Sequence, residues 1–296
     1  PPCRSQLVEL QKFMPHFEAA GIAVYALSYD EPDALRDFRD AHQITYSLLS
    51  DPDSKVISDF GILNTLIDPN DHPWYGIPYP GTYVINGNGV ITHKFFDNNL
   101  AVRVGPEQLL RAANGDSVTV TQTSSAKPNS STFALSFAGE SLVPTVQRDV
   151  VVRFNVPDGR HVYADPAPAG SVAVSVQLDA NDHLVQRPLV RPTPSPHTLG
   201  STGEQFNVHT GDFELRLPIT VNTPDIDGVP EITISGEVLW QTCDDDVCDL
   251  PQREGFTLTL PIAQPPAPAL GGPGAELEPK AMQHFQQMTQ RRKVKD

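Results

Sequence analysis

Cysteines are the residues of this chain whose type and spacing could support covalent chemistry. Cys243 and Cys248 lie five residues apart at the end of an apolar run, so they can close a small loop. Such a pair is either a structural disulfide or an exchangeable redox couple. Metal binding is disfavoured, because no further ligands occur at similar spacing near the pair, and we expect neither a metal nor another cofactor.

Cys3 is the odd cysteine of the three, and it has no partner left within the chain. It directly precedes a segment whose apolar residues recur at helical spacing, so its sulfur is expected near a helix N-terminus. The unpaired N–H groups and the dipole at that end favour a thiolate, which is the reactive form of cysteine. A buried, inert thiol is the alternative on position alone.

Two other groups of polar residues are less informative. The acidic run Asp244-Asp245-Asp246 lies between two of the cysteines, where it would either oppose thiolate formation by repulsion or form a solvated turn. We favour the turn. Five histidines lack the neighbouring residues that suggest catalysis, and we expect them to be surface or packing residues: His16, His42, His72, His161 and His209.

The elements that must position Cys3 alternate between helical and strand periods over residues 1–114. A first helix is expected from Leu7 to Phe17, ending at Gly21, and a buried strand over residues 22–28. The turn Asn86-Gly87-Asn88-Gly89 predicts a hairpin. The remaining predicted helices cover residues 32–41, 51–60 and 106–113, and the remaining strands cover 44–49, 82–85 and 90–96. This order predicts an α/β domain with a mixed sheet.

After Gly115 the pattern changes to short alternating runs separated by Pro, Gly, Asn and Asp, which predicts an all-β sandwich over residues 118–262. The predicted strands cover 150–156, 171–178, 213–221, 231–240 and 256–262. Residues 263–296 form a Pro/Gly-rich linker and a polar tail, for which a short helix and disorder are both compatible with the composition. We expect the basic end of this tail to be solvated.

Composition narrows the possible functions. The 296 residues carry a formal net charge of -15, so nucleic acid is not an expected partner, because phosphate binding requires a basic face. No run of about 18 apolar residues occurs, and we expect no membrane-spanning segment. The chain opens Pro1-Pro2-Cys3 without an initiator Met, which we interpret as a fragment or a processed product with sequence missing upstream.

Several segments of the first 114 residues resemble the redoxin branch of the thioredoxin superfamily, which includes the peroxiredoxin-like (alkyl hydroperoxide reductase/thiol-specific antioxidant) proteins. Pro1-Pro2-Cys3-Arg4 is similar to the end of that branch's Trp-Cys-Pro-Pro-Cys-Arg loop. The other similar segments are Tyr25 to Asp30, Leu48 to Asp53 with Phe60 to Ile62, and Ile77 to Gly89. The resemblance implies a thioredoxin-like fold that lacks its first strand here.

The same resemblance implies roles for individual residues. Cys3 matches the second cysteine of the Cys-x-x-Cys loop, and the first, attacking cysteine would immediately precede Pro1. Pro80 matches the cis-proline that faces this loop, and Tyr79 beside it is implied to contact substrate. Typical peroxiredoxins have an arginine where this chain has Pro80, and that departure favours disulfide exchange over peroxide reduction.

The second half is similar to the N-terminal periplasmic domain of the thiol:disulfide interchange protein DsbD. The residues that carry this resemblance are Arg160 to Ala164, Arg187 to Pro196 and Leu239 to Pro251. It implies an immunoglobulin-like fold in which Cys243 and Cys248 are the redox pair and Tyr163 is their packing neighbour and a substrate-contacting residue. A periplasmic or otherwise extracytoplasmic location also follows from the resemblance.

Together these features predict a thiol–disulfide oxidoreductase or thiol-dependent peroxidase. In this hypothesis the upstream cysteine attacks a disulfide or a hydroperoxide, Cys3 resolves the product, and the Cys243/Cys248 pair relays electrons. The expected partners are thioredoxin-like redox proteins, disulfide substrates and hydroperoxides. The alternative is a non-enzymatic binding module with a structural disulfide and a degenerate redoxin domain.

Overall fold

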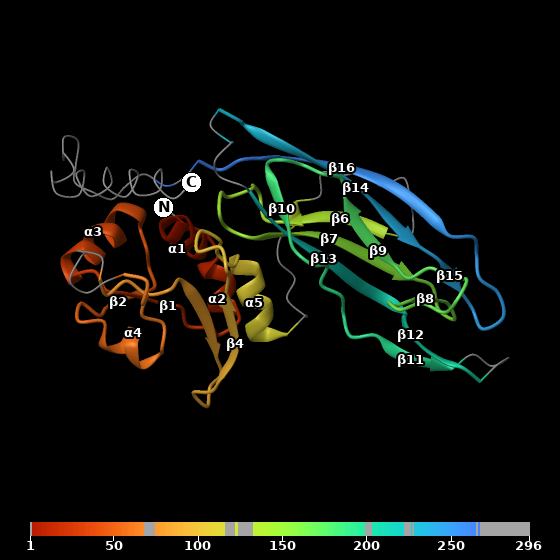
Figure 1. Cartoon of the computed structure of the whole chain (residues 1–296), viewed down its shortest axis with the longest axis horizontal. Helices are drawn as coiled ribbons and strands as arrows, with labels where there is room; N and C mark the ends of the chain where they lie inside the picture. Colours follow the sequence, from red (N-terminus) through yellow and green to blue (C-terminus); the bar gives the residue numbers. More distant parts are fainter. Residues whose placement is uncertain are drawn as a thin grey trace. The chain divides into compact units, whose positions relative to one another are not determined.

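A computed structural model describes residues 2–67, 75–115, 122–123, 133–198, 203–221, 226, 228–264 and 266 (Figure 1). By their internal contacts the residues form two compact units, one of residues 1–22 with 80–265 and one of residues 23–79 with 266–296. His72 and nearly all of the predicted linker and tail lie outside the described residues. The two units are described separately below.

The described part of the smaller unit is built around a strand–helix–strand sequence. Its elements are β1 (Tyr25–Ser28), α3 (Pro32–His42), β2 (Ser47–Ser50) and α4 (Lys55–Asp59). Strands β1 and β2 are parallel, with Tyr25 opposite Ser47, and α3 makes the crossover that parallel strands require. The expected buried strand at residues 22–28 is wrong in its burial, because Tyr25 is 65% exposed and the rest of β1 is half-buried.

The start of α4 is fixed by the carboxylate of Asp51. It accepts the backbone N–H of Lys55 at 3.0 Å and that of Ile57 at 2.9 Å, which pairs two N–H groups that have no partner within the helix. The helix begins at Lys55 and not at residue 51, because Ser54 adopts a left-handed backbone with φ 51°. Gly61, at φ 68°, follows its end as the sequence predicts.

The larger unit begins with two short helices where the sequence predicts one. Helix α1 (Pro2–Lys12) and helix α2 (Met14–Ala19) are separated at Phe13, because Pro15 lies in the first turn of α2 and has no N–H to continue a single helix. Strands β3 (Gly81–Ile85) and β4 (Ile91–Phe96) form the predicted hairpin, and α5 (Pro106–Asn114) follows. The side chain of Asn86 closes the hairpin turn by accepting two backbone N–H groups at 3.0 Å.

The α/β order predicted for residues 1–114 is confirmed, but the single mixed sheet is not. Among the described strands, β1 pairs with β2 in one two-stranded sheet and β3 pairs with β4 in another. The period of a segment shows that it forms a strand, whereas the choice of its partner depends on tertiary contacts that no single segment reveals.

The described strands of the all-β region of the larger unit form three sheets, seen on the right of Figure 1. The first contains β5 (Gln122–Thr123), β6 (Phe133–Ala138), β7 (Arg148–Val156), β10 (Leu184–Gln186) and β13 (Gly211–Val221). The second contains β9 (Ser175–Leu178), β14 (Glu231–Trp240) and β16 (Gln252–Pro261), and the third contains β8 (His161–Tyr163), β11 (Ser195–Thr198), β12 (Gln205–His209) and β15 (Thr242–Cys243). The predicted immunoglobulin-like sandwich is confirmed.

The core of this sandwich explains why its strands alternate. Ile232, Ile234, Gly236, Val238 and Trp240 are buried and alternate with exposed or half-buried residues, as one face of a strand requires. The Trp240 ring lies edge-on to that of Phe133, with the centroids 5.4 Å apart. Burying such side chains contributes about 1.5–3 kcal/mol each, so this core stabilises the larger unit.

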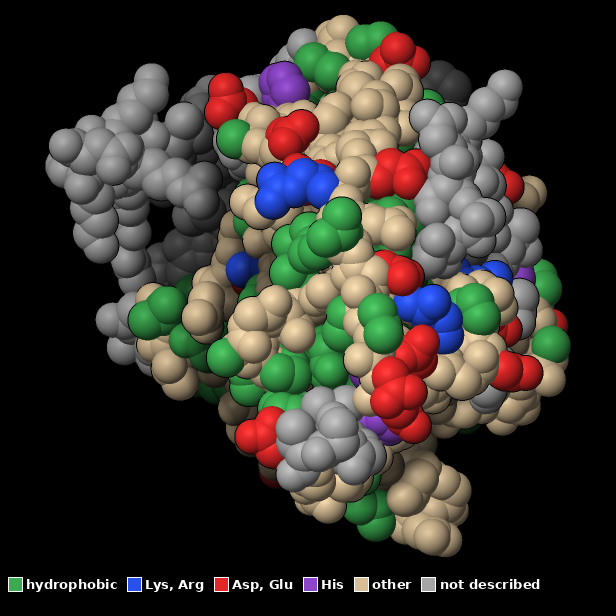
Figure 2. Space-filling model, turned by 90° about the vertical axis from the view of Figure 1, so that its right-hand side faces the viewer, with side chains coloured by type: hydrophobic (Ala, Val, Ile, Leu, Met, Phe, Trp, Pro, Cys, Tyr) green, Lys and Arg blue, Asp and Glu red, His purple; other side chains and the backbone are tan. Residues whose placement is uncertain are grey.

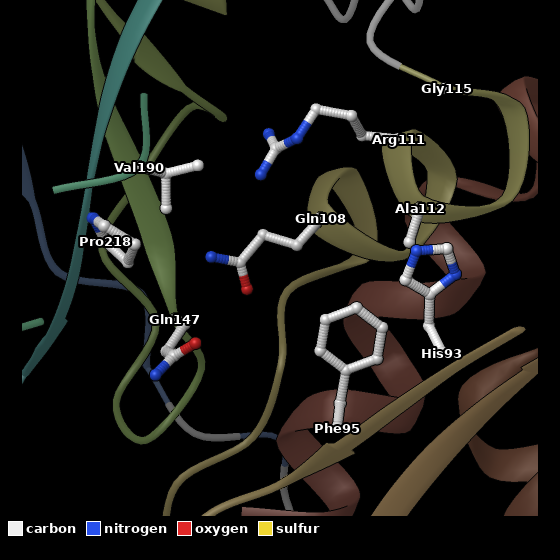
Figure 3. A pocket seen from close by; sticks show the side chains of 9 residues that line it. All are labelled: His93, Phe95, Gln108, Arg111, Ala112, Gly115, Gln147, Val190 and Pro218. Carbon is white, nitrogen blue, oxygen red and sulfur yellow. The ribbon is translucent and has the colours of Figure 1, made fainter. Parts of the chain in front are cut away.

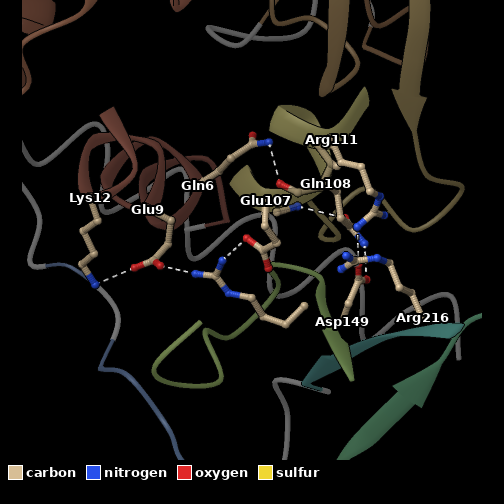
Figure 4. Close-up of polar contacts among 11 residues, drawn as sticks. Gln6, Glu9, Lys12, Glu107, Gln108, Arg111, Asp149 and Arg216 are labelled. Carbon is tan, nitrogen blue, oxygen red and sulfur yellow. Dashed lines mark hydrogen bonds and ion pairs between the residues drawn. The ribbon is translucent and has the colours of Figure 1, made fainter. Parts of the chain in front are cut away.

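Buried ion pairs connect α1, α5 and β7 within the larger unit (Figure 4). The guanidinium of Arg148, on β7, pairs with Glu9 of α1 and with Glu107 of α5, and all three side chains are buried. Burial raises the pKa of Glu107 to about 7, although the charge of Arg148 acts against this shift. Asp149, the next residue of β7, accepts hydrogen bonds from Gln108 at 2.8 Å and from Arg111 at 2.9 Å.

Candidate functional site

Cys3 is an exposed, free thiol in the first turn of α1. The predicted position near the start of a helix is therefore confirmed, and the alternative of a buried thiol is wrong. The guanidinium of Arg103 donates a hydrogen bond from Nη2 to Cys3 Sγ over 3.0 Å. A positive charge beside a cysteine at a helix N-terminus is the environment in which reactive cysteines are found.

Arg103 is fixed in this orientation by its own contacts. It lies between β4 and α5, is only 6% exposed, and donates from Nη1 to the carbonyl oxygens of Leu100 at 2.7 Å and Val102 at 2.9 Å. Its backbone bonds to Thr145 and Gln147, each over 2.8 Å. The guanidinium is therefore held beside the sulfur before any substrate arrives, which lowers the cost of organising the site.

The helix that carries Cys3 is held by polar contacts one and two turns further along. Gln6 donates from its side-chain amide to the carbonyl oxygen of Val104 at 3.2 Å and to Oγ1 of Thr82 at 3.4 Å. Glu9 pairs with the buried Arg148. These contacts fix α1 against the start of β3 and against the segment between Arg103 and α5, so the Cys3–Arg103 pair is supported from both sides.

The structure tests the prediction made for Pro80 but not the one made for Tyr79. Among the described residues the one cis peptide bond is Asp165–Pro166, so the bond before Pro80 is trans and the expected cis-proline is wrong. The trans form is favoured by about 0.5–1 kcal/mol wherever the surrounding structure does not enforce cis. Tyr79 belongs to the smaller unit, where its backbone N–H donates to Ile62 over 2.7 Å, and its predicted contact with substrate stays a prediction.

Cys243 and Cys248 form a disulfide. The two cysteines differ in accessibility, because Cys243 is fully buried on β15 whereas Cys248 is exposed. A thiolate from another protein can therefore reach the sulfur of Cys248 more readily than that of Cys243. Cys3 is free and makes no disulfide with either of them.

The loop between these two cysteines is a tight turn. Oδ1 of Asp244 accepts the backbone N–H of Val247 at 2.7 Å and that of Asp246 at 2.9 Å, and these two bonds hold the pKa of the Asp244 carboxyl below its usual range. The interpretation of the acidic run as a solvated turn is thus confirmed. Val247 and Leu250 on either side of Cys248 are 64% and 86% exposed. Figure 2, which faces the end of the sandwich where β15 lies, shows hydrophobic side chains beside acidic ones on this surface.

Tyr163 packs where the sequence predicts it. It is buried in a small cluster with Val208 and Cys243, and burial raises the pKa of its hydroxyl. The packing contact with the cysteine pair is confirmed, while direct contact of Tyr163 with a substrate stays a prediction.

His161 stands directly opposite Cys243 where β8 pairs with β15. It is 2% exposed, and burial, followed by the nearby His197, lowers its pKa. The two imidazole rings lie 4.5 Å apart, and Nε2 of His197 is 3.0 Å from Oδ1 of Asp245. Sequence reasoning missed His197, because 36 positions separate it from His161.

The other described histidines of the predicted set pack against aromatic rings as expected: His16 on Phe13, His42 on Phe38 and His209 on Phe213.

A pocket of about 460 Å³ lies within the larger unit (Figure 3). The side chains of Gln108 and Arg111 from α5 point into it, and residues of β4 complete one wall. Both of those side chains are already bound to Asp149. Cys3 and the cysteine pair are not among the residues that line it.

The N-terminal and C-terminal regions of the chain match two different protein families. Residues 1–94 match the AhpC/TSA family, and residues 128–260 match the family of the N-terminal region of the thiol:disulfide interchange protein DsbD. The first region is peroxiredoxin-like, and the second is DsbD-like. The resemblances seen in the sequence are thus confirmed for both regions.

Curated relatives of the peroxiredoxin-like region are named peroxiredoxins. A putative peroxiredoxin of Mycobacterium tuberculosis is 33% identical over 95 residues, which are 31% of this chain and 57% of the relative. Peroxiredoxin Bcp of Escherichia coli is 30% identical over 101 residues, which are 33% of this chain and 61% of the relative. The chain therefore spans less than two thirds of the length of these relatives.

Two solved structures have limited similarity to parts of this chain. Enterococcus faecalis AhpC is 22% identical, with a TM-score of 0.33 over 40% of this chain and 72% of that one. The reduced N-terminal domain of Neisseria meningitidis DsbD is 16% identical, with a TM-score of 0.30 over 46% of this chain and 94% of that one.

None of the helices in the described part of the chain combines the length and apolarity needed to cross a membrane.

Proposed function

We propose that this chain belongs to a thiol-dependent peroxidase in which Cys3 is the thiol that attacks a hydroperoxide. The observation that carries the proposal is the hydrogen bond from Arg103 to Cys3 Sγ at an exposed position in the first turn of a helix. The sequence alone favoured disulfide exchange, because Pro80 occupies the place of an activating arginine. Arg103 supplies a guanidinium from another part of the chain, and this contact supports peroxide reduction despite that departure.

In the proposed reaction the Cys3 thiolate attacks the terminal oxygen of the hydroperoxide and the O–O bond breaks. Cys3 becomes a sulfenic acid, and the departing oxygen takes up a proton to give an alcohol, or water when the substrate is hydrogen peroxide. A thiol then condenses with the sulfenic acid, which forms a disulfide and releases water. Arg103 acts by stabilising negative charge on sulfur before the attack. In this proposal Cys3 attacks, whereas the sequence hypothesis gave it the resolving role.

The Cys243–Cys248 pair is proposed to exchange electrons with thioredoxin-like proteins in an extracytoplasmic compartment. The exposed Cys248 is accessible to a partner thiolate, and the exposed Val247 and Leu250 offer apolar contact area beside it. Its reduced dithiol form would supply the two electrons that return Cys3 from disulfide to thiol, and the covalent tether raises the effective concentration of one site at the other. The DsbD-like region and an intact disulfide support the oxidising location.

The complete burial of Cys243 favours a second candidate, in which the disulfide is structural and this region only binds other molecules. The two are distinguished by equilibrating the full chain against glutathione buffers and trapping free thiols, in a Cys3→Ser variant so that only the pair is counted. A potential above about −300 mV supports an electron carrier, and a much lower one supports a structural bond.

The role of Cys3 is tested by treating the full chain with one equivalent of hydrogen peroxide in the presence of a sulfenic-acid trap. We expect one adduct, located at Cys3 by peptide mass spectrometry and absent in Cys3→Ser. If the wild-type thiol forms no adduct and stays reduced, Cys3 is not a peroxide-reactive residue and the proposal fails.

A further inference from the structure

We propose that His161, His197 and Asp245 form a binding site for a divalent transition-metal ion such as Zn²⁺. One ligand atom from each of the three side chains lies within 4.8 Å of the other two. The three residues come from strand β8, strand β11 and the turn between Cys243 and Cys248. The peroxidase proposal for Cys3 does not depend on this site.

The strongest support comes from the unsatisfied nitrogen of His161. Its side chain is almost completely buried, yet Nε2 has no hydrogen-bond partner among the described residues. A buried polar atom without a partner costs about 1–3 kcal/mol, so such an atom in a native protein calls for an explanation. A metal ion bound at that nitrogen supplies one, because a neutral imidazole nitrogen is a common ligand of zinc.

The geometry of the other two ligands fits the same ion. Nε2 of His197 and Oδ1 of Asp245 are 3.0 Å apart. Tetrahedral zinc with bonds of about 2.0–2.1 Å places its ligand atoms about 3.3 Å from each other, so this pair needs only a small adjustment. Two imidazoles and one carboxylate favour zinc and neighbouring transition metals over Ca²⁺ and Mg²⁺, which prefer oxygen ligands only.

The charges around the site also favour a cation. Asp244 and Asp246 flank Asp245, and Arg160 is the nearby positive group that acts on the His161 imidazole. The Arg160 guanidinium is occupied by Asp249 at 2.7 Å and by the carbonyl oxygen of Thr242 at 3.1 Å. Its charge is therefore largely balanced by Asp249, and the acidic turn leaves the surroundings of the three ligands negative.

The position of Asp245 gives the proposed site a structural consequence. Asp245 lies within the loop that the Cys243–Cys248 disulfide closes, whereas His161 and His197 lie on strands of the third sheet. A bound ion would therefore tie the disulfide loop to β8 and β11 through bonds that do not involve sulfur.

The test is isothermal titration of ZnCl₂ into the oxidised full chain, with Cys3→Ser as the parent so that the free thiol cannot bind the metal. We expect one Zn²⁺ per chain in the parent. His197→Gln and Asp245→Asn should each weaken binding at least tenfold. The control His93→Gln should leave the affinity unchanged, and the control Asp246→Asn, which removes a nearby charge but no ligand, should weaken binding far less. His93 is an exposed histidine of β4, and Asp246 is the exposed neighbour of Asp245.

His197 and Asp245 are chosen for substitution because neither side chain is fully buried, so we expect their variants to fold. Urea unfolding of each variant without metal tests whether it does. X-ray absorption of the zinc-loaded parent should show nitrogen and oxygen ligands and no sulfur. The proposal is wrong if the parent does not bind Zn²⁺ at about 100 μM, or if the control variants lose as much affinity as His197→Gln and Asp245→Asn.

Discussion

Replacing Arg148 with methionine should destabilise the larger unit strongly, because it removes the one cation between two buried carboxylates. Arg148 is 2% exposed and pairs with both Glu9 and Glu107. Methionine fills much of the same volume but leaves the carboxylates without their shared partner. The effect should be on folding stability first, and on the placement of α1 as a consequence.

The size of the stability loss depends on which partners the carboxylates of Glu9 and Glu107 retain after the substitution. Glu9 retains Lys12, whose Nζ lies 2.6 Å from it, whereas Oε1 of Glu107 is already without a partner and Oε2 would lose Arg148. Removing one member of a buried ion pair costs about 3–5 kcal/mol. The cost should be smaller at pH 5.5 than at pH 8, because the pKa of Glu107 is about 7 and its protonated form does not need the cation.

The assay is urea unfolding at pH 8, with Arg153→Met as the matched control. Arg153 lies on the same strand, β7, but its partner Glu214 is paired at the surface, where such a bond contributes about 0–1 kcal/mol. We expect a loss of about 3–5 kcal/mol for Arg148→Met and less than about 1 kcal/mol for the control. Equal losses in the two variants would refute the reasoning that burial determines the difference.

Two further predictions concern single carboxylates. Burial raises the pKa of Glu107 from 4.5 to about 7, so its contribution to stability is present below pH 4.5 and is lost as the pH rises through 7; the free energy of unfolding should fall by up to about 1.4 kcal/mol per pH unit between these values. In Glu107→Gln that component of the pH dependence should vanish, and an unchanged profile in urea titrations would contradict the assignment. Asp51→Ala should cost about 1–2 kcal/mol, because the N–H groups of Lys55 and Ile57 lose their acceptor. Thermal unfolding of Asp51→Ala beside Asp53→Ala, an exposed neighbour, measures this loss, and equal midpoints would exclude the cap.

Local patterns in the sequence were sufficient for most of the fold. The Asn86-Gly87-Asn88-Gly89 turn predicts the hairpin, since Asn86 bonds within the turn itself, and the alternation of β14 predicts its buried face. The break at Phe13 was also encoded locally, by Pro15, although the helical spacing of apolar residues obscured it. The division of these strands into two separate sheets, β1 with β2 and β3 with β4, could not be read in this way, because it depends on contacts between distant segments.

The candidate sites show the same difference between contacts that are local in the sequence and contacts that only the fold creates. Cys243 and Cys248 are close in sequence and their disulfide was predictable, as was the packing of Tyr163 beside them. Arg103 lies 100 positions from Cys3, and no spacing rule connects an arginine between β4 and α5 with a thiol on α1. Residues that meet only through the fold leave no periodic signal in the sequence, so the environment of the thiol had to come from the structure.

The measurement that tests the central claim most directly is the rate at which hydrogen peroxide oxidises Cys3 in the full chain. The variants to compare are Arg103→Met, Arg103→Lys and the surface control Arg253→Met, whose exposed guanidinium pairs with Glu237. A hydrogen bond from a charged donor contributes about 1.5–3 kcal/mol, so Arg103→Met should slow the reaction by about ten- to a hundredfold or more. Arg103→Lys should recover part of the rate, and Arg253→Met should match the wild type. Equal rates in the wild type and Arg103→Met would contradict the proposed role of Arg103 in activating Cys3.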